Sequence, residues 1–352
     1  MKTIHVTASR SYDVCIGPGL LRECGARIAA EAGVGIAAVV TESTVAPLFA
    51  ETVCASLEKA GFSVVRYVFP AGEASKTLST YGDILNFLAE HRLTRADLLV
   101  ALGGGVVGDM AGFAAATYLR GIPFVQLPTT LLAAVDSSVG GKTAVDLPAG
   151  KNMAGAFCQP SLVLCDTDTL QTLPGDALRD GFAEMVKTGV LAGEELFSAL
   201  ERESLAAAGE ETISRCVEYK RSIVAEDEFD TGKRHLLNLG HTVGHAVELC
   251  SRYTVSHGKA VAMGLAAMGR ACARRGLCRP ETAERIAAVL ERAGLPTSLP
   301  FGAEALAAAA MSDKKREGNR LPLIVVEGIG RCRIETISEG EFTDWLREGG
   351  AV

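Results

Sequence analysis

Three of the six histidines, His241, His245 and His257, lie in one short stretch of the sequence. His241 and His245 are four residues apart in a segment with a helical pattern, so their side chains share one helix face. Glu184 lies in another helical segment, GFAEMVKTGV, which is apolar around it. Imidazoles and a carboxylate from separate segments suit zinc or a similar divalent ion that keeps open coordination positions. We therefore predict a metal site from these residues.

Spacing alone leaves the set of metal ligands open. It favours His241 and His245 as a pair, as in helical H-x-x-x-H sites. The glutamate that makes such a motif a metalloprotease is missing, because Val243 and Gly244 occupy the middle of the motif. Each histidine taken singly fits a satisfied core residue equally well, whereas the cluster together favours a ligand role.

A glycine-rich turn provides a second set of candidate residues. The apolar run LLVAL leads into GGGVVGD, where Gly103, Gly105 and Gly108 fit the pattern G-x-G-x-x-G. Such glycines let backbone N–H groups approach a pyrophosphate at a helix N-terminus, and Asp109 would suit a ribose hydroxyl or the nicotinamide end. The turn departs from the usual fingerprint because no clear ribose-binding acid follows about 20 residues later, so a tight turn without a ligand is the alternative. The loop PAGEASK at 70–76 is a second candidate for ribose and phosphate contacts, or a surface turn with an ordinary salt bridge.

The polar stretch at 127–152 places hydroxyl, carboxylate, amide and lysine groups among small apolar residues. Its polar members are Thr129, Thr130, Asp136, Ser137, Ser138, Lys142, Lys151 and Asn152. Buried polar groups are costly without partners, and a ligand with a phosphate and several hydroxyls would supply them; a self-satisfied network is the alternative. Lys187 shares a helix face with Glu184, and Lys220 and Arg234 lie in similar segments. Several cations converging on one cleft would bind phosphate and carboxylate together.

The elements that must position these residues divide into two parts. Up to residue 173, helical patterns separate apolar strand-like runs at 36–41, 64–69, 98–102, 123–127 and 161–165. This order predicts a parallel sheet covered by helices. After Leu173–Asp176 the sequence is mainly helical, with expected helices at 212–227, 239–250, 258–275 and 280–293, a hairpin at 321–335 and a last helix at about 339–348. We predict an α/β fold, with an N-terminal Rossmann-like nucleotide-binding domain at 1–173 and a mainly α-helical metal- and substrate-binding domain at 174–352.

Composition excludes several classes of protein. Apolar residues make up 48% of the 352 residues, which is ample for a core and excludes a disordered or fibrous chain. The net charge is -7, and interspersed acids and bases argue against broad nucleic-acid binding. No charge-free apolar stretch of eighteen residues or more is present, so no membrane span is expected. The ten scattered cysteines are typical of reduced thiols in a cytoplasmic protein.

Several motifs together resemble the 3-dehydroquinate synthase family over essentially the whole chain. These motifs are GGGVVGD, LPTTLLAAVDSSVGGKTAVD, GKN, GFAEMVK, LNLGHTVGHAVE and SHGKAVAMG. The resemblance implies a homodimeric carbon–oxygen lyase that uses NAD and one zinc or cobalt ion. Its substrate would be a phosphorylated sugar acid, 3-deoxy-D-arabino-heptulosonate 7-phosphate, and its products 3-dehydroquinate and phosphate. Transient oxidation by NAD would make phosphate elimination possible, and re-reduction, ring opening and an internal aldol step would close the carbocycle.

The resemblance also implies roles for individual residues. The metal ligands would be Glu184, His241 and His257, so that His245 faces the substrate instead. The other catalytic residues would be Lys142, Lys187 and Asn152. Substrate contacts would come from Asp136, Lys151, Lys220, Arg234, Asn238, from Arg120 of the partner subunit, and from one of Lys314 and Lys315. NAD contacts would come from Glu42 (where the family usually has aspartate), Ala71, Gly72, Glu73, Ala74, Ser75, Lys76, Gly105, Val106, Val107, Gly108, Asp109, Thr129, Thr130, Lys142, Lys151, Thr169, Leu170, Gln171 and Thr172.

Three other functions fit part of this pattern. Another sugar-phosphate cyclase would share most motifs, but Asn152, Asn238 and the DKK lysines favour dehydroquinate as the product. A metal-dependent polyol dehydrogenase usually has an aspartate as its first ligand and lacks the GGKTAVD and GKN pair. A non-catalytic binding protein on the same scaffold would have no need for the intact set of polar residues.

Overall fold

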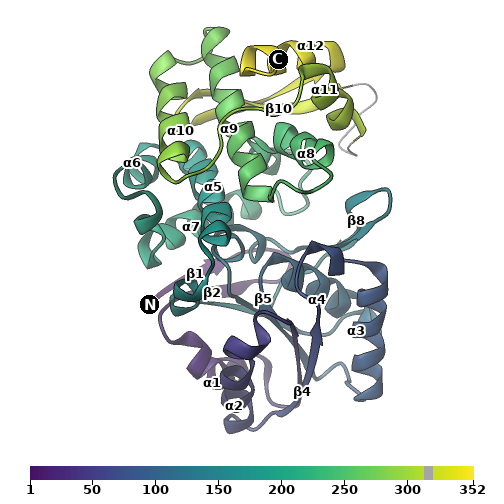
Figure 1. Cartoon of the computed structure of the whole chain (residues 1–352). Coiled ribbons are helices and arrows are strands. Elements are labelled where there is room, and N and C mark those ends of the chain that lie inside the picture. The colour runs from purple at the N-terminus through teal and green to yellow at the C-terminus, as the bar shows by residue number, and fades with distance from the viewer. Residues whose placement is uncertain (313–319) are drawn as a thin grey trace. The chain divides into compact units, whose positions relative to one another are not determined.

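The structure is a computed structural model, which describes residues 1–312 and 320–352 (Figure 1). The two lysines predicted to offer one further substrate contact, Lys314 and Lys315, lie outside the described residues. The chain divides into two compact units. The first contains Met1–Leu173 and Lys220–Phe229, and the second contains Pro174–Tyr219 and Asp230–Val352.

A seven-stranded sheet forms the centre of the first unit, with the order β1-β2-β9-β6-β5-β3-β4. β1 pairs with β2 in antiparallel orientation, and all the other neighbours are parallel. The strands are β1 (Lys2–Val6), β2 (Tyr12–Gly17), β3 (Ile36–Glu42), β4 (Ser63–Phe69), β5 (Leu98–Gly103), β6 (Phe124–Pro128) and β9 (Leu162–Asp166). The predicted parallel sheet is confirmed, and each predicted strand is present with ends shifted by no more than one residue.

Helices cover both faces of this sheet (Figure 1). Val39 and Val100 join one core cluster with α1 (Leu20–Ala32) and α2 (Glu51–Lys59). The next residues along the same strands, Val40 and Ala101, join the opposite cluster with α3 and α4, because successive side chains of a strand point to opposite faces. The remaining elements of this unit are α3 (Leu78–Glu90), α4 (Gly105–Thr117), the hairpin of β7 (Lys142–Leu147) and β8 (Gly150–Phe157), and the short helical turns η1 (Ala46–Ala50), η2 (Glu73–Ser75), η3 (Tyr118–Arg120), η4 (Ala133–Ser137) and η5 (Thr167–Thr172).

The second unit is mainly helical, as predicted. Its central helix, α9 (His257–Arg274), is buried along most of its length and packs against α5, α8, α10 and α12. The other elements are α5 (Gly175–Ala192), α6 (Glu194–Glu203), η6 (Ser204–Ala207), the first part of α7 (Glu210–Glu226), η7 (Lys233–Asn238), α8 (His241–Cys250), α10 (Pro280–Arg292), α11 (Ala303–Ser312), β10 (Arg320–Gly328), β11 (Arg331–Ser338) and α12 (Glu339–Gly349). The four helices, the hairpin and the last helix that the sequence predicted are all present, with helix ends shifted by no more than two residues.

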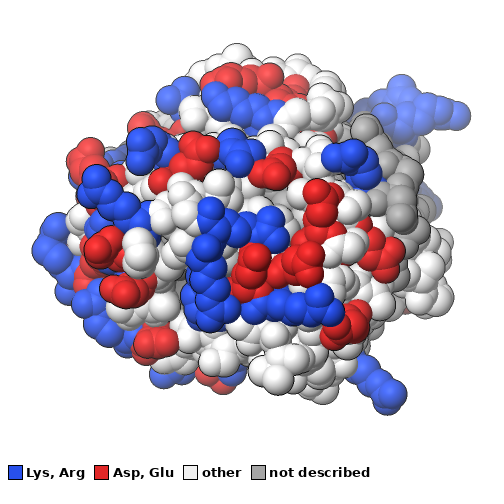
Figure 2. All heavy atoms as spheres, turned by 90° about the horizontal axis from the view of Figure 1, so that it is seen from above, with Lys and Arg blue, Asp and Glu red and all other residues white. Residues whose placement is uncertain are grey.

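Acidic and basic side chains are mixed on the molecular surface. On the face drawn in Figure 2, lysines and arginines lie beside aspartates and glutamates. Arg285 of α10 illustrates such mixing in the second unit, because its guanidinium group lies 2.8 Å from Glu194 and 2.7 Å from Glu201. In the described parts of the chain, no helix combines the length and the apolar character that a membrane crossing requires.

Candidate metal centre and ligand-binding loops

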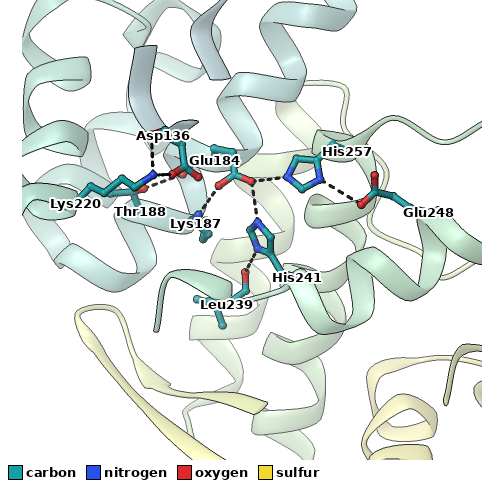
Figure 3. Close-up of polar contacts among 9 residues, drawn as sticks. All are labelled: Asp136, Glu184, Lys187, Thr188, Lys220, Leu239, His241, Glu248 and His257. Atoms are coloured by element: carbon teal, nitrogen blue, oxygen red, sulfur yellow. Dashed lines mark hydrogen bonds and ion pairs between the residues drawn. The ribbon is translucent and has the colours of Figure 1, made fainter. Parts of the chain in front are cut away.

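Glu184, His241 and His257 meet inside the second unit (Figure 3). Glu184 lies in α5, and the two histidines are the first residues of α8 and α9. The Nε2 atom of His241 is 3.3 Å from Oε1 of Glu184, and the Nε2 atom of His257 is 3.2 Å from the same oxygen. One ligand atom from each of the three residues lies within 4.8 Å of the others. The three residues implied as metal ligands are therefore brought together.

The surroundings of Glu184 fit a cation. Its side chain is 1% exposed, yet neither carboxylate oxygen forms a hydrogen bond of normal geometry. The Nζ atom of Lys187 lies 2.5 Å from Oε2. Burial would raise the pKa of Glu184, but Lys187 and His241 hold it well below its usual range, so the group is an anion. A buried anion that faces two imidazole nitrogens has the charge and the lone pairs that a divalent ion requires.

Without a bound ion, His241 and His257 differ in charge. Burial lowers the pKa of His241 to about 4, so this imidazole is neutral. Burial also acts to lower the pKa of His257, but the carboxylates of Glu184 and Glu248 raise it to about 10. The charge on His257 thus compensates two buried acids, and a divalent cation at the same place would take over that role.

Each histidine is held at the nitrogen that points away from Glu184 (Figure 3). The Nδ1 atom of His241 lies 3.2 Å from the carbonyl oxygen of Leu239. The Nδ1 atom of His257 lies 3.2 Å from Oε2 of Glu248. Metal-binding histidines usually donate their second N–H to a carbonyl or a carboxylate, which fixes the ring and leaves the other nitrogen for the ion. The pattern around both rings therefore matches that of metal ligands.

Close approaches between helices fix the positions of the three side chains. A Cβ atom on Gly258, next to His257, would lie 2.2 Å from the Cα atom of Asp180 in α5. A Cβ atom on Gly264 of α9 would lie 2.0 Å from the carbonyl oxygen of Gly240, the residue before His241. Only glycine permits these approaches, so the sequence sets the spacing of α5, α8 and α9 where they carry the candidate ligands.

His245 lies one turn after His241, as its spacing predicts, but outside the group of Glu184. Its ring centroid is 5.5 Å from that of His241 and 6.1 Å from that of His257. His257, from another helix, takes the position beside Glu184 that spacing alone favoured for His245. His245 instead belongs to a second group of possible ligand atoms, with Glu248 and His257.

Sequence reasoning missed Glu248, although a signal for it was present. Glu248 follows His241 by seven residues, which places both on one face of α8, two helical turns apart. An acid at such a position on a helix with an otherwise apolar buried face indicates a polar partner. The partner is the imidazole of His257.

Two other predicted substrate contacts of the second unit lie in η7 (Lys233–Asn238). Arg234 lies in η7 and is 1% exposed, and Asn238 ends the same turn. Buried arginine requires polar partners. The substrate contact expected of Arg234 stays a prediction.

A buried polar network joins three of the predicted ligand-binding segments in the first unit. The Nζ atom of Lys76 lies 2.6 Å from Oδ2 of Asp109 and 2.5 Å from Oδ1 of Asn152. Lys151, next to Asn152 in the β7–β8 hairpin, lies 3.3 Å from Glu73. The loop at 70–76 thus has two ion pairs. The pair of Glu73 with Lys151 is partly exposed, as considered from the sequence, whereas the pair of Lys76 with Asp109 is buried.

The electrostatics of this network follow from burial. Burial raises the pKa of Asp109, and the ammonium of Lys76 offsets this only in part. Burial would lower the pKa of Lys76, but Asp109 and Glu73 raise it on balance. The first turn of α4, which contains Gly105 to Asp109, is therefore joined by a charged pair to Lys76, the residue that follows η2.

Further predicted residues of the first unit lie on neighbouring loops. Asp136 in η4 forms an ion pair with Lys220 of α7, so two candidate substrate contacts are joined (Figure 3). Thr129, which follows β6, is 2% exposed, and its hydroxyl has no hydrogen-bond partner among the described residues. An unpaired buried hydroxyl fits the expectation that a ligand supplies its partner.

Three further predicted residues of the first unit form local hydrogen bonds or have an unusual backbone conformation. Glu42 ends β3, and its oxygens accept hydrogen bonds from the backbone N–H groups of Thr44 and Val45. The Thr169 hydroxyl donates to the carbonyl of Asp166 at the start of η5, the turn that holds the predicted NAD contacts up to Thr172. Arg120 has a φ of 68°, in the left-handed region.

The fold groups the chain with solved sugar-phosphate cyclases. A structure of 2-deoxy-scyllo-inosose synthase complexed with carbaglucose-6-phosphate, NAD+ and Co2+ is 26% identical and has a TM-score of 0.89, covering 99% of this chain and 100% of that chain. A structure of 2-epi-5-epi-valiolone synthase from Streptomyces hygroscopicus subsp. jinggangensis 5008 with NAD+ and Zn2+ is 27% identical and has a TM-score of 0.87, covering 98% of both chains. Glycerol dehydrogenase from Schizosaccharomyces pombe, at 15% identity and a TM-score of 0.69, shares the fold alone.

Within this class the chain belongs to the 3-dehydroquinate synthase family. The family described as 3-dehydroquinate synthase N-terminal matches residues 66–180, and 3-dehydroquinate synthase C-terminal matches residues 181–316. The 3-dehydroquinate synthase of Caulobacter vibrioides (strain NA1000 / CB15N) is 46% identical over 100% of both chains. That of Geobacter metallireducens is 47% identical over 99% of this chain and 100% of its own length. The family indicated by the motifs and the fold class predicted from the order of strands and helices are confirmed.

Proposed function

We propose that this protein is a carbon–oxygen lyase that converts 3-deoxy-D-arabino-heptulosonate 7-phosphate to 3-dehydroquinate and phosphate. The observation that carries this proposal is the cluster of Glu184, His241 and His257, with both Nε2 atoms facing one carboxylate oxygen. Relatives that are 43–47% identical over nearly the whole chain are named 3-dehydroquinate synthase, whereas the inosose and valiolone synthases are 26–27% identical. The relatives therefore support dehydroquinate as the product over the carbocycle of another cyclase.

One divalent ion, zinc or cobalt, would be held by the Glu184 cluster, and NAD by the loops of the first unit. Related synthases have been solved with NAD+ and either Co2+ or Zn2+. When bound, the ion would acidify a coordinated hydroxyl and NAD would accept and return a hydride. Residues 1–173 would thus form the NAD-binding domain and residues 174–352 the domain that binds the metal and much of the substrate.

The protein's own side chains would bind and orient the substrate. The ammonium group of Lys187 compensates the charge of Glu184. From this position it would also attract an anionic group of the substrate. Asp136 and Lys220 lie in the first unit, so we propose that the α/β unit also contributes to substrate binding. His245, one turn from a ligand but outside the Glu184 group, would face the substrate and move a proton. Lys142, Lys151, Asn152, Arg234 and Asn238 would complete the binding of phosphate, carboxylate and hydroxyls.

We also propose that the enzyme is a homodimer that works in the cytoplasm. Arg120 lies in η3, directly after α4, and its backbone is in the left-handed region, which is strained for a residue other than glycine. In the dimer this arginine would reach the site of the partner subunit. All ten cysteines lie among the described residues as free thiols, which agrees with a reducing compartment. Size-exclusion chromatography with light scattering would measure the mass and test the dimer.

The decisive experiment mixes purified protein with the heptulosonate phosphate, NAD and zinc. We expect release of phosphate and formation of dehydroquinate without net NADH. Accumulation of one NADH per substrate would instead identify a polyol dehydrogenase. Parallel reactions with a hexose 6-phosphate test for another cyclase, which would release phosphate from that sugar and not from the heptulosonate.

A further inference from the structure

The imidazole of His257 lies between two carboxylates (Figure 3). Its Nε2 atom is 3.2 Å from Oε1 of Glu184, and its Nδ1 atom is 3.2 Å from Oε2 of Glu248. The side chain of Glu248 is 4% exposed. Glu248 is therefore a buried carboxylate that contacts a candidate metal ligand, although it does not itself contact the position beside Glu184.

We propose that Glu248 is a positioning residue that holds His257 as a metal ligand. By accepting the Nδ1–H of His257, Glu248 fixes the ring and selects the tautomer whose Nε2 lone pair faces Glu184. This inference rests on the proposed metal site and goes beyond it, because it assigns a role to a residue outside the ligand set.

The difference between the two histidines explains why a carboxylate is needed here. His241 has a backbone carbonyl, that of Leu239, as the partner of its Nδ1 atom. Its side chain is 11% exposed, whereas that of His257 is 33% exposed. A more exposed ring at the start of a helix is easily turned toward water, and a hydrogen bond to a charged acceptor is about twice as strong as one between neutral groups.

Helix α8 positions two of the three candidate ligands. Glu248 follows His241 by seven residues on the same face of α8. The helix therefore carries one ligand at its first residue and the acceptor for another ligand two turns later. A shift of α8 along its axis would move both imidazoles relative to Glu184, so the position of this helix couples them.

Glu248, His245 and His257 also form a second group whose ligand atoms lie within 4.8 Å of one another. With one ion held beside Glu184 by Nε2, His257 could hold a second ion at Nδ1 only after losing the protons of both nitrogens. The hydrogen bond to Glu248 requires a proton on Nδ1, and this arrangement needs only neutral imidazole. Geometry thus favours the positioning role over a second ion.

The test compares metal binding by Glu248→Ala, Glu248→Gln and the wild-type chain. Metal-free protein is titrated with Co2+ in competition with a chelator, and the visible absorption of the bound cobalt is recorded. We expect one ion per chain in every case, with affinity reduced about 10- to 100-fold in Glu248→Ala. Glu248→Gln keeps a neutral acceptor and should lose less, and both variants should change the cobalt spectrum because the ring of His257 is less fixed.

The matched controls are Glu284→Ala and Glu284→Gln, which make the same changes at an exposed position of α10. They should keep the wild-type affinity and spectrum, and far-ultraviolet circular dichroism should show that all variants fold. Wild-type affinity and spectrum in Glu248→Ala would overturn the positioning role. Two ions per wild-type chain and one in Glu248→Ala would overturn it in favour of a second metal site. A wild-type chain that binds no ion would overturn the proposed metal site itself.

Discussion

Gly258 of α9 lies against Asp180 of α5 so closely that a Cβ atom on the glycine would be 2.2 Å from the Cα atom of the aspartate. The neighbours of this contact are candidate metal ligands, because His257 precedes Gly258 and Glu184 lies one turn after Asp180. The hydroxyl of Ser256 also donates a hydrogen bond of 2.7 Å to Asp180. The distance between two candidate ligands is therefore set by backbone packing rather than by the side chains alone.

Gly258→Ala should destabilise the second unit and weaken metal binding. The added methyl group meets backbone atoms, so α5 and α9 must separate, which typically costs about 1–3 kcal/mol in an overpacked site. Gly82→Ala in α3 is the matched control, because nothing lies within 4 Å of its added Cβ atom. In a helix interior this control should gain about 0.5–1 kcal/mol. Urea unfolding and a metal titration measure both effects, and equal behaviour of the two variants would contradict the packing argument.

His257→Ala and His245→Ala should separate metal binding from turnover. His257 faces Glu184 at 3.2 Å, so its removal should yield protein that retains little metal. His245 lies outside the group of Glu184, so His245→Ala should keep one ion per chain while turnover falls about 100-fold or more. Elemental analysis of the purified variants gives the metal content. Metal-free His245→Ala protein would show that the ligand assignment is wrong.

Periodicity predicted most of the fold because each element carries its own pattern. The buried strand β5 is apolar throughout, as expected for a parallel strand covered on both faces. The β7–β8 hairpin was not predicted, because its sequence is rich in glycine and polar residues and its burial is partial. Local pattern carries little information about strands of that kind.

Long-range contacts explain why the units differ from a simple division of the chain at residue 173. The segment Lys220–Phe229 belongs to the first unit, although it continues helix α7. Its end is held by Glu228, which accepts hydrogen bonds from Ser9 and Gln159. Ser9 and Glu228 are 219 residues apart, and helical periodicity contains no signal for such a contact.

The candidate metal site shows a similar limit. Helical spacing correctly placed His241 and His245 on one face, but residues that share a face need not direct their rings to the same point. The third member of the group, His257, comes from another helix. Its place in the sequence made it a candidate, but only motif resemblance favoured it over His245 as a ligand. The place of Glu248 on an apolar helix face indicated a polar partner, but its sequence surroundings could not show that the partner is His257 of another helix.

The contributions of Lys76 and Asp109 to the free energy of unfolding should be strongly coupled. Their side chains are 5% and 19% exposed, and the Nζ to Oδ2 distance is 2.6 Å. Asp109→Asn leaves the buried ammonium of Lys76 without its counter-charge, which should reduce the free energy of unfolding by about 3 kcal/mol. Adding Lys76→Met to this variant removes the uncompensated charge and should restore part of the loss. A double-mutant cycle measured by urea unfolding gives the coupling, and additive losses would refute it.

Asp97 should make the first unit more stable at pH values above the usual pKa range of aspartate than at pH values below it. Its carboxylate accepts hydrogen bonds from the backbone N–H of Ile36 at 2.6 Å and of Thr94 at 2.7 Å. Burial would raise its pKa, but these donors and the Thr94 hydroxyl lower it on balance. Because the folded pKa lies below the unfolded value of about 3.9, the group stabilises the fold above that value. This contribution is lost as pH falls through the lowered folded pKa.

Asp97→Asn should therefore lower the free energy of unfolding at pH 7 by about 1–3 kcal/mol, the cost of losing hydrogen bonds to a charged acceptor. The difference from the wild-type chain should stay constant between pH 7 and about 5 and shrink as the wild-type carboxyl becomes protonated. Urea unfolding at several pH values measures this difference. Asp83→Asn, at an exposed position of α3, is the control and should differ little from wild type at any pH. A difference for Asp97→Asn that grows toward acid pH would have the opposite sign and would exclude this role for the carboxylate.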